Sequence, residues 1–139
     1  MSNFNKEKII TLLNEASKAL EILREYKNYD RKKLLANYKD MSVVKYHFII
    51  LIEASIDICN HISSKKYKQV ADSYSHCFSI LAENNFIEQE LGDKLSLFAK
   101  FRNVLVHLYW KVDDSIVVAK LEELFVFEEY FSKISQIEN

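Results

Sequence analysis

The residues most able to do chemistry lie in one short stretch, residues 100–110, which reads KFRNVLVHLYW. Arg102, Asn103, His107 and Tyr109 bring a guanidinium, an amide, an imidazole and a phenol into eight residues, and the residues between them are apolar. Polar groups set among apolar spacers indicate side chains beside a buried surface. There each one needs a hydrogen-bond partner, because leaving it unpaired costs about 1–3 kcal/mol.

An arginine beside a histidine could act on a phosphodiester. A guanidinium holds phosphate oxygens and offsets developing negative charge, and a histidine can take or give a proton near neutral pH. On RNA the neighbouring 2′-hydroxyl could be the nucleophile without a metal, which would leave a 2′,3′-cyclic phosphate and a free 5′-hydroxyl. Taken alone, an arginine and a histidine on a helix are more often a structural ion pair and a core histidine.

Helical geometry limits how these side chains could converge. On an ideal helix Arg102 and Tyr109 point to the same side, since they are seven residues apart, and Asn103 and His107 share the neighbouring side. His107 then lies about 140° round the helix from Arg102. We therefore expect convergence to need a distorted helix end or a second copy of the chain across one cleft.

Two carboxylates could support the arginine. Glu53 and Asp57 lie one turn apart on residues 42–64, the most apolar of the expected helices. A carboxylate in such surroundings needs a cation or a hydrogen-bond donor. Two interpretations stay open: a pair at the solvent edge, or groups that hold Arg102 in place.

The composition predicts an all-α fold in a single domain over residues 1–139. The chain has no proline and one glycine, Gly92, so it lacks the turn residues that all-β domains use. Apolar residues recur at three- and four-residue spacing in several segments. In the first half of the chain we expect a helix over 5–29, a short helical piece capped by Asp30 and a helix over 42–64. A helix over 70–83 and a short helical piece over 86–91 follow, and Gly92 marks a bend. The next helix is capped by Asp93 and passes Tyr109, and the last helix is capped by residues 113–115.

The charge pattern constrains nucleic-acid binding. The formal net charge is −1, so any RNA contact must use a local patch. Residues 63–69 form a basic link in which Lys65, Lys66 and Lys68 surround Tyr67. Most such runs are solvated loops, but a minority contacts phosphates through charge and stacking.

We expect no cofactor and no metal site. The three other histidines have no cysteine or carboxylate at a convincing ligand spacing, and no glycine-rich nucleotide-binding motif is present. Cys59 and Cys77 lie in apolar segments and are expected to be reduced, buried thiols. The longest apolar run, residues 48–52, is too short for a bilayer, and residues 1–8 show no signal peptide, so we expect a cytoplasmic protein with no membrane partner.

Residues 102–109, RNVLVHLY, resemble the motif of an arginine, four residues, a histidine, any residue and a tyrosine in HEPN-domain toxins. The similar subgroup is the HepT-like one, whose partners are MntA-like minimal nucleotidyltransferase antitoxins. Residues 46–62, with EASIDICNH at 53–61, look like the central helix of that family, and residues 74–87 look like its next helix and turn. The resemblance covers about residues 40–113 and departs after His61, where relatives often carry glycine and proline.

This resemblance implies an all-α, up-and-down HEPN-like bundle of four to five helices that forms a homodimer with both motifs facing one cleft. It implies the toxin component of a bacterial or archaeal toxin–antitoxin pair and a metal-independent endoribonuclease, with Arg102 and His107 catalytic and Asn103 in support. Tyr109 matches the tyrosine to which the cognate nucleotidyltransferase antitoxin transfers AMP; the added phosphates would occupy Arg102 and repel RNA. The alternative is a non-catalytic helical partner that docks and regulates a nucleotidyltransferase.

Overall fold

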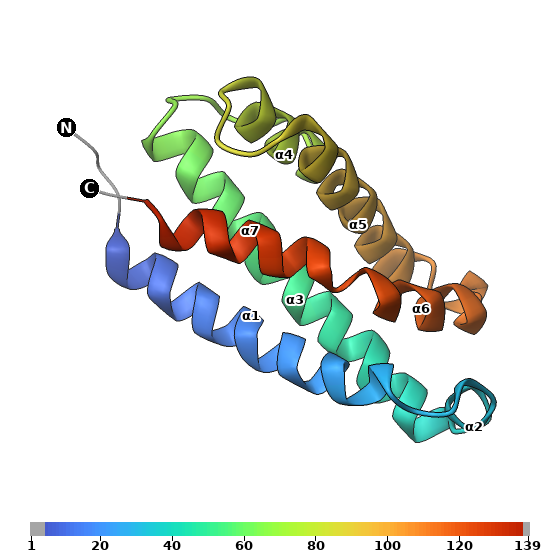
Figure 1. Cartoon of the computed structure of the whole chain (residues 1–139). Coiled ribbons are helices and arrows are strands. Elements are labelled where there is room, and N and C mark those ends of the chain that lie inside the picture. Colours follow the sequence, from blue (N-terminus) through green and yellow to red (C-terminus); the bar gives the residue numbers. More distant parts are fainter. Residues whose placement is uncertain (1–4, 138–139) are drawn as a thin grey trace.

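The computed structural model in Figure 1 describes residues 5–137, and every regular element in that range is helical. The elements in chain order are α1 (Lys6–Lys27), α2 (Arg31–Leu35), α3 (Tyr38–Lys65), α4 (Tyr74–Glu83), α5 (Gln89–His107), the 3-10 turn η1 (Tyr109–Lys111), α6 (Asp114–Lys120), the 3-10 turn η2 (Leu121–Glu123) and α7 (Phe125–Ser135). The all-α prediction is confirmed. Residues 5–137 form seven α-helices where four to five were expected; the two shortest, α2 and α6, have five and seven residues.

The long helices pack around one apolar core. In Figure 1, α1 and α3 run side by side in opposite directions, α4 and α5 pack together, and the start of α1 lies near the end of α7. The buried apolar side chains of these helices form a continuous cluster. Phe98 of α5 contacts Phe48 of α3 and Phe127 of α7, with ring centroids 6.2 and 4.7 Å away, so α5 is fixed against both neighbours.

Side-chain caps explain where most helices begin. In each case the cap oxygen accepts a hydrogen bond from a backbone N–H of the first turn. The caps are Asn5 for α1, Asp30 for α2, Asn37 for α3, Ser73 for α4 and Asp113 for α6. The caps at Asp30 and Asp113 were predicted; the unpredicted caps at Asn37 and Ser73 make α3 begin earlier, and α4 later, than expected.

The prediction was wrong at the start of α5. In place of a short helix over 86–91, a bend at Gly92 and a cap at Asp93, one helix runs from Gln89 through both residues. Gly92 is buried, and a Cβ there would lie only 3.1 Å from the Cβ of Ala82 on α4. The glycine therefore permits close approach of α4 and α5 and does not bend the chain. The Asp93 carboxylate instead accepts a hydrogen bond of 2.9 Å from the side chain of Gln89.

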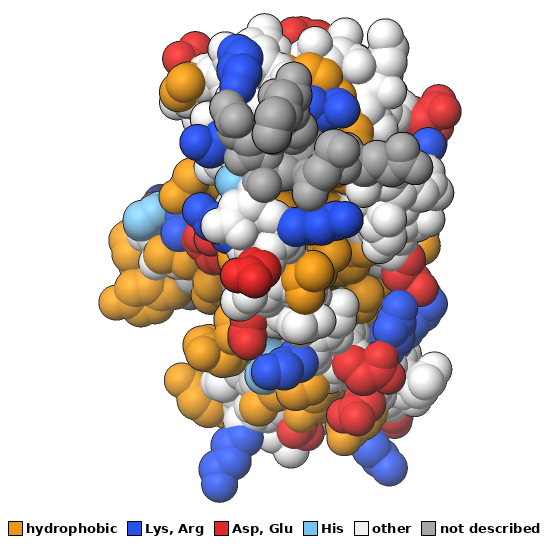
Figure 2. Space-filling model, turned by 90° about the vertical axis from the view of Figure 1, so that its left-hand side faces the viewer, with side chains coloured by type: hydrophobic (Ala, Val, Ile, Leu, Met, Phe, Trp, Pro, Cys, Tyr) orange, Lys and Arg blue, Asp and Glu red, His pale blue; other side chains and the backbone are white. Residues whose placement is uncertain are grey.

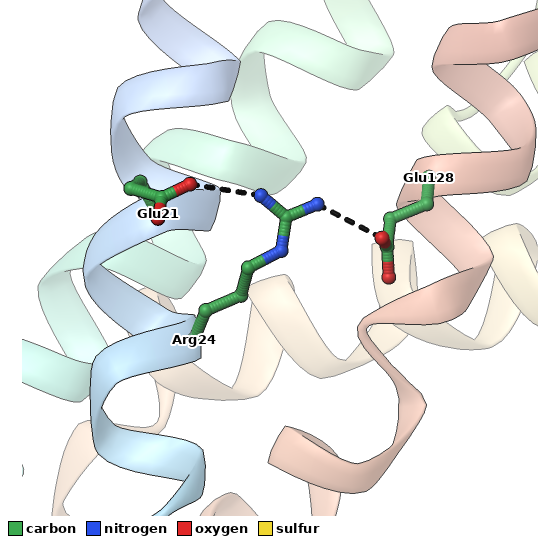
Figure 3. Close-up of polar contacts among 3 residues, drawn as sticks. All are labelled: Glu21, Arg24 and Glu128. Carbon is green, nitrogen blue, oxygen red and sulfur yellow. Dashed lines mark hydrogen bonds and ion pairs between the residues drawn. The ribbon is translucent and has the colours of Figure 1, made fainter.

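The C-terminal segment is three helical pieces where one helix was expected, namely α6, η2 and α7. Figure 3 shows Arg24 of α1 donating to Glu21 on the same helix and to Glu128 on α7, each at 2.9 Å. Hydrogen bonding to Glu128 raises the pKa of Arg24. These groups are exposed enough for water to screen them, so packing holds α7 in place more than this ion pair does.

The two cysteines are free and buried, as predicted. Burial raises the pKa of the Cys59 thiol, which keeps it protonated. Nearby, the buried Tyr130 hydroxyl donates to the carbonyl of Ser55 at 2.9 Å and so ties α7 to α3. Between residues 5 and 137, no helix combines the length and the apolar character needed to cross a bilayer.

The close contact at Gly92 makes a stability prediction. Gly92→Val should lower the free energy of unfolding by about 1–3 kcal/mol, because the new methyl groups meet α4 across a packed interface. Lys100→Val is the matched control, since it puts the same β-branched residue at an exposed position of α5 and should cost less than about 1 kcal/mol. Urea denaturation measures both values, and equal losses would contradict the packing role of Gly92.

Candidate active site

The last turns of α5 carry the polar motif, and the helix ends at His107. Leu108 leaves the helical region with φ −127° and ψ 37°, and its N–H closes the last turn on the carbonyl of Val104 at 3.0 Å. Tyr109 then begins the separate turn η1. The expectation that one helix passes Tyr109 was wrong, so a regular helix cannot be used to place Tyr109 on the same side as Arg102.

Arg102, Asn103 and His107 meet within one chain. Nη1 of Arg102 donates to Oδ1 of Asn103 at 3.0 Å and lies 3.4 Å from Nε2 of His107. The long arginine side chain spans the angle between residues 102 and 107 at the end of the helix, so this contact needs no second copy. Because a guanidinium only donates hydrogen bonds, Nε2 of His107 is the acceptor, and its lone pair is engaged as long as Arg102 keeps this contact.

Glu53 of α3 holds the other side of the guanidinium. Its Oε1 forms an ion pair with Nε of Arg102. The Arg102 side chain is 14% exposed and that of Glu53 is 32% exposed, so the charges are shielded from water and depend on each other. Of the two interpretations left open by the sequence, Glu53 occupies the position of a group that holds Arg102.

Asp57 lies one turn further along α3 and is placed differently. Its residue is exposed, and among residues 5–137 it forms no ion pair with Arg102. Partial burial and the negative charge of Glu53 raise the pKa of Asp57, while Lys8 acts in the opposite direction. This position matches the solvent-edge interpretation, and the supporting role assigned to Asp57 has no contact behind it.

Tyr74 of α4 is a site residue that was not predicted from the sequence. Its ring lies over the guanidinium of Arg102, with the centroid 5.2 Å from Cζ. A cation over an aromatic face is attracted to the ring, so Tyr74 restrains Arg102 from a third helix. No local pattern could show this contact, because it depends on how α4 packs against α5.

Tyr109 is placed at the open edge of the site. It is 71% exposed, and its ring packs edge-on against Trp110 with centroids 5.4 Å apart. Among residues 5–137 no contact joins it to Arg102 or His107. Most of the Tyr109 side chain is therefore open to solvent.

The other histidines are engaged elsewhere. Their ring nitrogens contact backbone groups: His47 the carbonyl of Val43 at 2.7 Å, His61 the N–H of Asn5 at 2.9 Å and His76 the N–H of Asp72 at 2.9 Å. Within the described range, no group of three His, Cys, Asp or Glu side chains is arranged to hold a metal ion.

Sequence comparison supplies the family. The pattern of the family described as "Ribonuclease HepT-like" matches residues 16–134. The chain belongs to the HepT-like ribonuclease family. It is 37% identical over 83 residues to the mRNA nuclease HepT of Shewanella oneidensis. The aligned segment covers 59% of this chain and 62% of that protein. It is 24% identical over 137 residues to the tRNA nuclease HepT of Aphanizomenon flos-aquae. That alignment covers 99% of this chain and 92% of the relative. A third relative, a putative RNase of Archaeoglobus fulgidus, is 33% identical over 64% of its length. This chain therefore spans less than two thirds of the length of the Shewanella and the Archaeoglobus relatives.

Solved HepT-like structures have the same fold. A tri-AMPylated HEPN toxin of S. oneidensis in complex with an MNT antitoxin is similar with a TM-score of 0.86 and 27% identity, over 94% of this chain and 98% of that one. A chain of the toxin–antitoxin complex MntA–HpeT, solved as a mutant, is similar with a TM-score of 0.85 and 26% identity. The alignment covers 94% of this chain and 99% of that one. The resemblance to HepT-like HEPN toxins is confirmed.

Glu53 and Asp57 make a matched pair for mutagenesis. Glu53→Gln should lower the free energy of unfolding by about 1–2 kcal/mol, between the values of exposed and buried ion pairs, because Arg102 loses its counter-charge. Asp57→Asn removes the same charge one turn away and should cost less than about 0.5 kcal/mol. Chemical denaturation measures both, and an equal cost would refute the special role of Glu53.

The ring of Tyr74 should couple energetically to Arg102. In a double-mutant cycle of stability, Tyr74→Leu with Arg102→Gln should give a coupling of about 0.5–1 kcal/mol, as expected for a cation over a partly exposed ring. Tyr74→Phe keeps the ring and should retain most of that coupling. The contact is unimportant if Leu and Phe at position 74 give the same coupling.

Proposed function

We propose that this protein is the toxin of a toxin–antitoxin pair and acts as a metal-independent endoribonuclease through Arg102 and His107. The observation that carries the proposal is the 3.4 Å contact between the Arg102 guanidinium and Nε2 of His107 at one helix end. The relatives named as mRNA and tRNA nucleases support RNA as the substrate. The protein would act as one domain in the cytoplasm, where such RNAs are found.

In the proposed reaction, the guanidinium binds the scissile phosphate. Its Nη2 has no hydrogen-bond partner among residues 5–137, so it is available to a phosphate oxygen, and Nη1 can exchange its contact with His107 for a second oxygen. Asn103, which accepts from Nη1, keeps the guanidinium turned toward the imidazole. Negative charge that builds on the phosphate in the transition state is then stabilised by a cation already in position.

His107 would serve proton transfer. As a base, Nε2 takes the proton of the 2′-hydroxyl while that oxygen forms a bond to phosphorus. The bond from phosphorus to the 5′ oxygen breaks, and the leaving oxygen takes up a proton. The products are a 2′,3′-cyclic phosphate and a 5′-hydroxyl, and no oxidant or second substrate is consumed.

A homodimer would complete this cleft. His107 of a second copy, already protonated, would supply the proton that the leaving 5′ oxygen takes up, while the first His107 holds the proton of the 2′-hydroxyl. Exposed apolar side chains surround the motif: Val104 is 36%, Leu108 39% and Trp110 65% exposed. Such a patch beside a polar site is typical of a protein interface.

A cognate nucleotidyltransferase antitoxin would silence the site by transferring AMP from ATP to the phenolic oxygen of Tyr109, with loss of the phenolic proton and release of pyrophosphate. The phenol is 71% exposed and follows His107 by two residues, so the transferred phosphates would lie close to the catalytic groups. Their negative charge would compete with RNA for Arg102 and repel the RNA backbone. The S. oneidensis HEPN toxin, which was solved in a tri-AMPylated form with its MNT antitoxin, supports this part of the proposal.

The catalytic pair can be tested directly. Arg102→Ala and His107→Ala should each lower the RNA cleavage rate by at least about 100-fold, because each removes a group used in the transition state. Both should also relieve growth arrest on expression. Arg24→Ala removes a guanidinium on the α1–α7 face and is the control. Cleavage at the parental rate by either site variant would reject this mechanism.

The modification can be tested by intact mass. Protein co-expressed with an MNT-type nucleotidyltransferase antitoxin that binds it should gain the mass of one or more AMP units, and Tyr109→Phe should prevent this gain. Tyr38→Phe, at an 86% exposed tyrosine outside the motif, should be modified normally. Full modification of Tyr109→Phe would exclude Tyr109 as the acceptor. A modified protein whose unmodified form never cleaves RNA would favour the non-catalytic regulatory partner.

A further inference from the structure

A second group of cationic and aromatic side chains lies on another part of the bundle. An open pocket of about 390 Å³ is lined by Lys66, Tyr67, Asn85, Phe86, Lys133 and Gln136, together with Ile137. These residues come from the turn after α3, the turn between α4 and α5, and the end of α7. Figure 2 looks onto the end of the molecule where α1 begins and α7 ends, and its upper half shows several lysine or arginine side chains among hydrophobic ones.

Backbone geometry fixes one wall of this pocket. The basic link expected over residues 63–69 is shorter than predicted, because α3 continues to Lys65. The chain then turns sharply: Lys68 has a φ of 56°, and the N–H of Gln69 bonds back to the carbonyl of Ser63 at 3.0 Å. Lys66 and Tyr67 are therefore held at a defined place at the helix end.

The opposite wall is fixed in a similar way. Asn85 has a φ of 60°, a left-handed conformation that asparagine tolerates better than most residues, and the N–H of Phe86 bonds to the carbonyl of Leu81 at 2.9 Å. This tight turn after α4 brings the amide of Asn85 and the ring of Phe86 to the pocket beside Lys133 of α7.

The charges of the pocket favour an anion. Lys66 and Lys133 are exposed, and neither forms an ion pair with any residue between 5 and 137. Among residues 5–137, no carboxylate lines this pocket, so within that range the two ammonium groups have no counter-charge there. The Lys66 ammonium lies 5.8 Å from the centroid of the Tyr67 ring. A phosphate bound between the two lysines would gain two charge-assisted hydrogen bonds.

The aromatic rings favour a nucleobase beside that phosphate. Tyr67 and Phe86 are half-buried, pack on the core and also line the pocket, so a base can stack there without unfolding the site. Stacking on an aromatic ring is worth about 1–3 kcal/mol per base and tolerates any sequence. The amides of Asn85 and Gln136 supply both donors and acceptors for a base or ribose.

The pocket continues into a groove toward α5. A neighbouring cavity of about 350 Å³ shares Asn85, Phe86 and Lys133 with it and extends to Glu88 and Gln89. The Glu88 carboxylate repels phosphate, which places the anion at the Lys66 end. Gln89 precedes Arg102 by 13 residues, which is about 20 Å along α5, so several nucleotides of one strand could connect the two regions.

We propose that this groove is a second binding site for single-stranded RNA, with a phosphate between Lys66 and Lys133 and a base against Tyr67 or Phe86. The inference rests on the proposed function, since it assigns to the groove a stretch of the same RNA that is cleaved near Arg102. The site supplies affinity for long RNA while Arg102 and His107 do the chemistry.

Binding is measured first, without cleavage. Full-length protein carrying His107→Ala is titrated into a labelled single-stranded RNA oligonucleotide, and the dissociation constant is followed by fluorescence anisotropy at several salt concentrations. The test variant adds Lys66→Ala and Lys133→Ala; the control adds Lys18→Ala and Lys27→Ala, two exposed lysines of α1. We expect the test variant to bind roughly tenfold more weakly and its slope of log affinity against log salt to fall by about 0.7, because it loses its contact with one phosphate of a single strand. The control variant should keep most of the RNA affinity and most of the salt dependence. Equal behaviour of the two variants would overturn the inference.

Cleavage is measured second, so that failure of the groove and failure of the proposed function can be told apart. In the chain with His107 intact, the two lysine substitutions should raise KM for a long RNA and leave kcat, and the cleavage of a dinucleotide, unchanged. If the lysine variant cleaves long RNA with an unchanged KM, the groove is not an RNA-binding site, while the proposed ribonuclease activity is retained. If the parental chain does not cleave RNA but binding still depends on the two lysines, the proposed ribonuclease activity is wrong and the groove remains an RNA-binding site.

Discussion

The site depends on one constraint, the need of the Arg102 guanidinium for a counter-charge. A cation with so little exposed surface is costly unless it is paired and hydrogen-bonded. The partner is Glu53, on α3, so the register between α3 and α5 decides whether the arginine is held at all. Packing of Phe98 against Phe48 sets that register from the core side. The bundle therefore positions the chemistry through the same helix pair that forms much of its interior.

The other site residues follow from that arrangement. Once Nε is held by Glu53, Nη1 is turned toward Asn103 and His107, and the end of α5 at Leu108 leaves the imidazole on an open edge. The ring of Tyr74 covers the guanidinium from α4, which the close contact at Gly92 keeps against α5. Residues of three helices, α3, α4 and α5, thus restrain one side chain. Such restraint lets a cation stabilise developing charge without reorganising during the reaction.

Part of this could be predicted from the sequence, and the division has physical reasons. The lack of proline and the single glycine indicated helices, and Asp30 and Asp113 act as the caps that their type and position suggest. Arg102 and His107 were identified by residue type and spacing, and the resemblance to a family then favoured a catalytic role over a structural one. The course of α5 was not predictable in the same way, because Gly92 has a packing role that is invisible without α4. The place of Tyr74, and the contrast between Glu53 and Asp57, are tertiary effects as well: residues one turn apart on the same helix differ only in what lies opposite them.

The central claim is that Glu53 holds Arg102 beside His107 so that both groups bind the same phosphate. NMR of the Arg102 Nε–H and of the His107 ring nitrogens, during titration with a 2′,3′-cyclic nucleotide that mimics the reaction product, tests this claim most directly. The account predicts that both signals shift along one binding curve and that Glu53→Gln weakens that binding for both together. A response of only one side chain, or two curves with different dissociation constants, would contradict it.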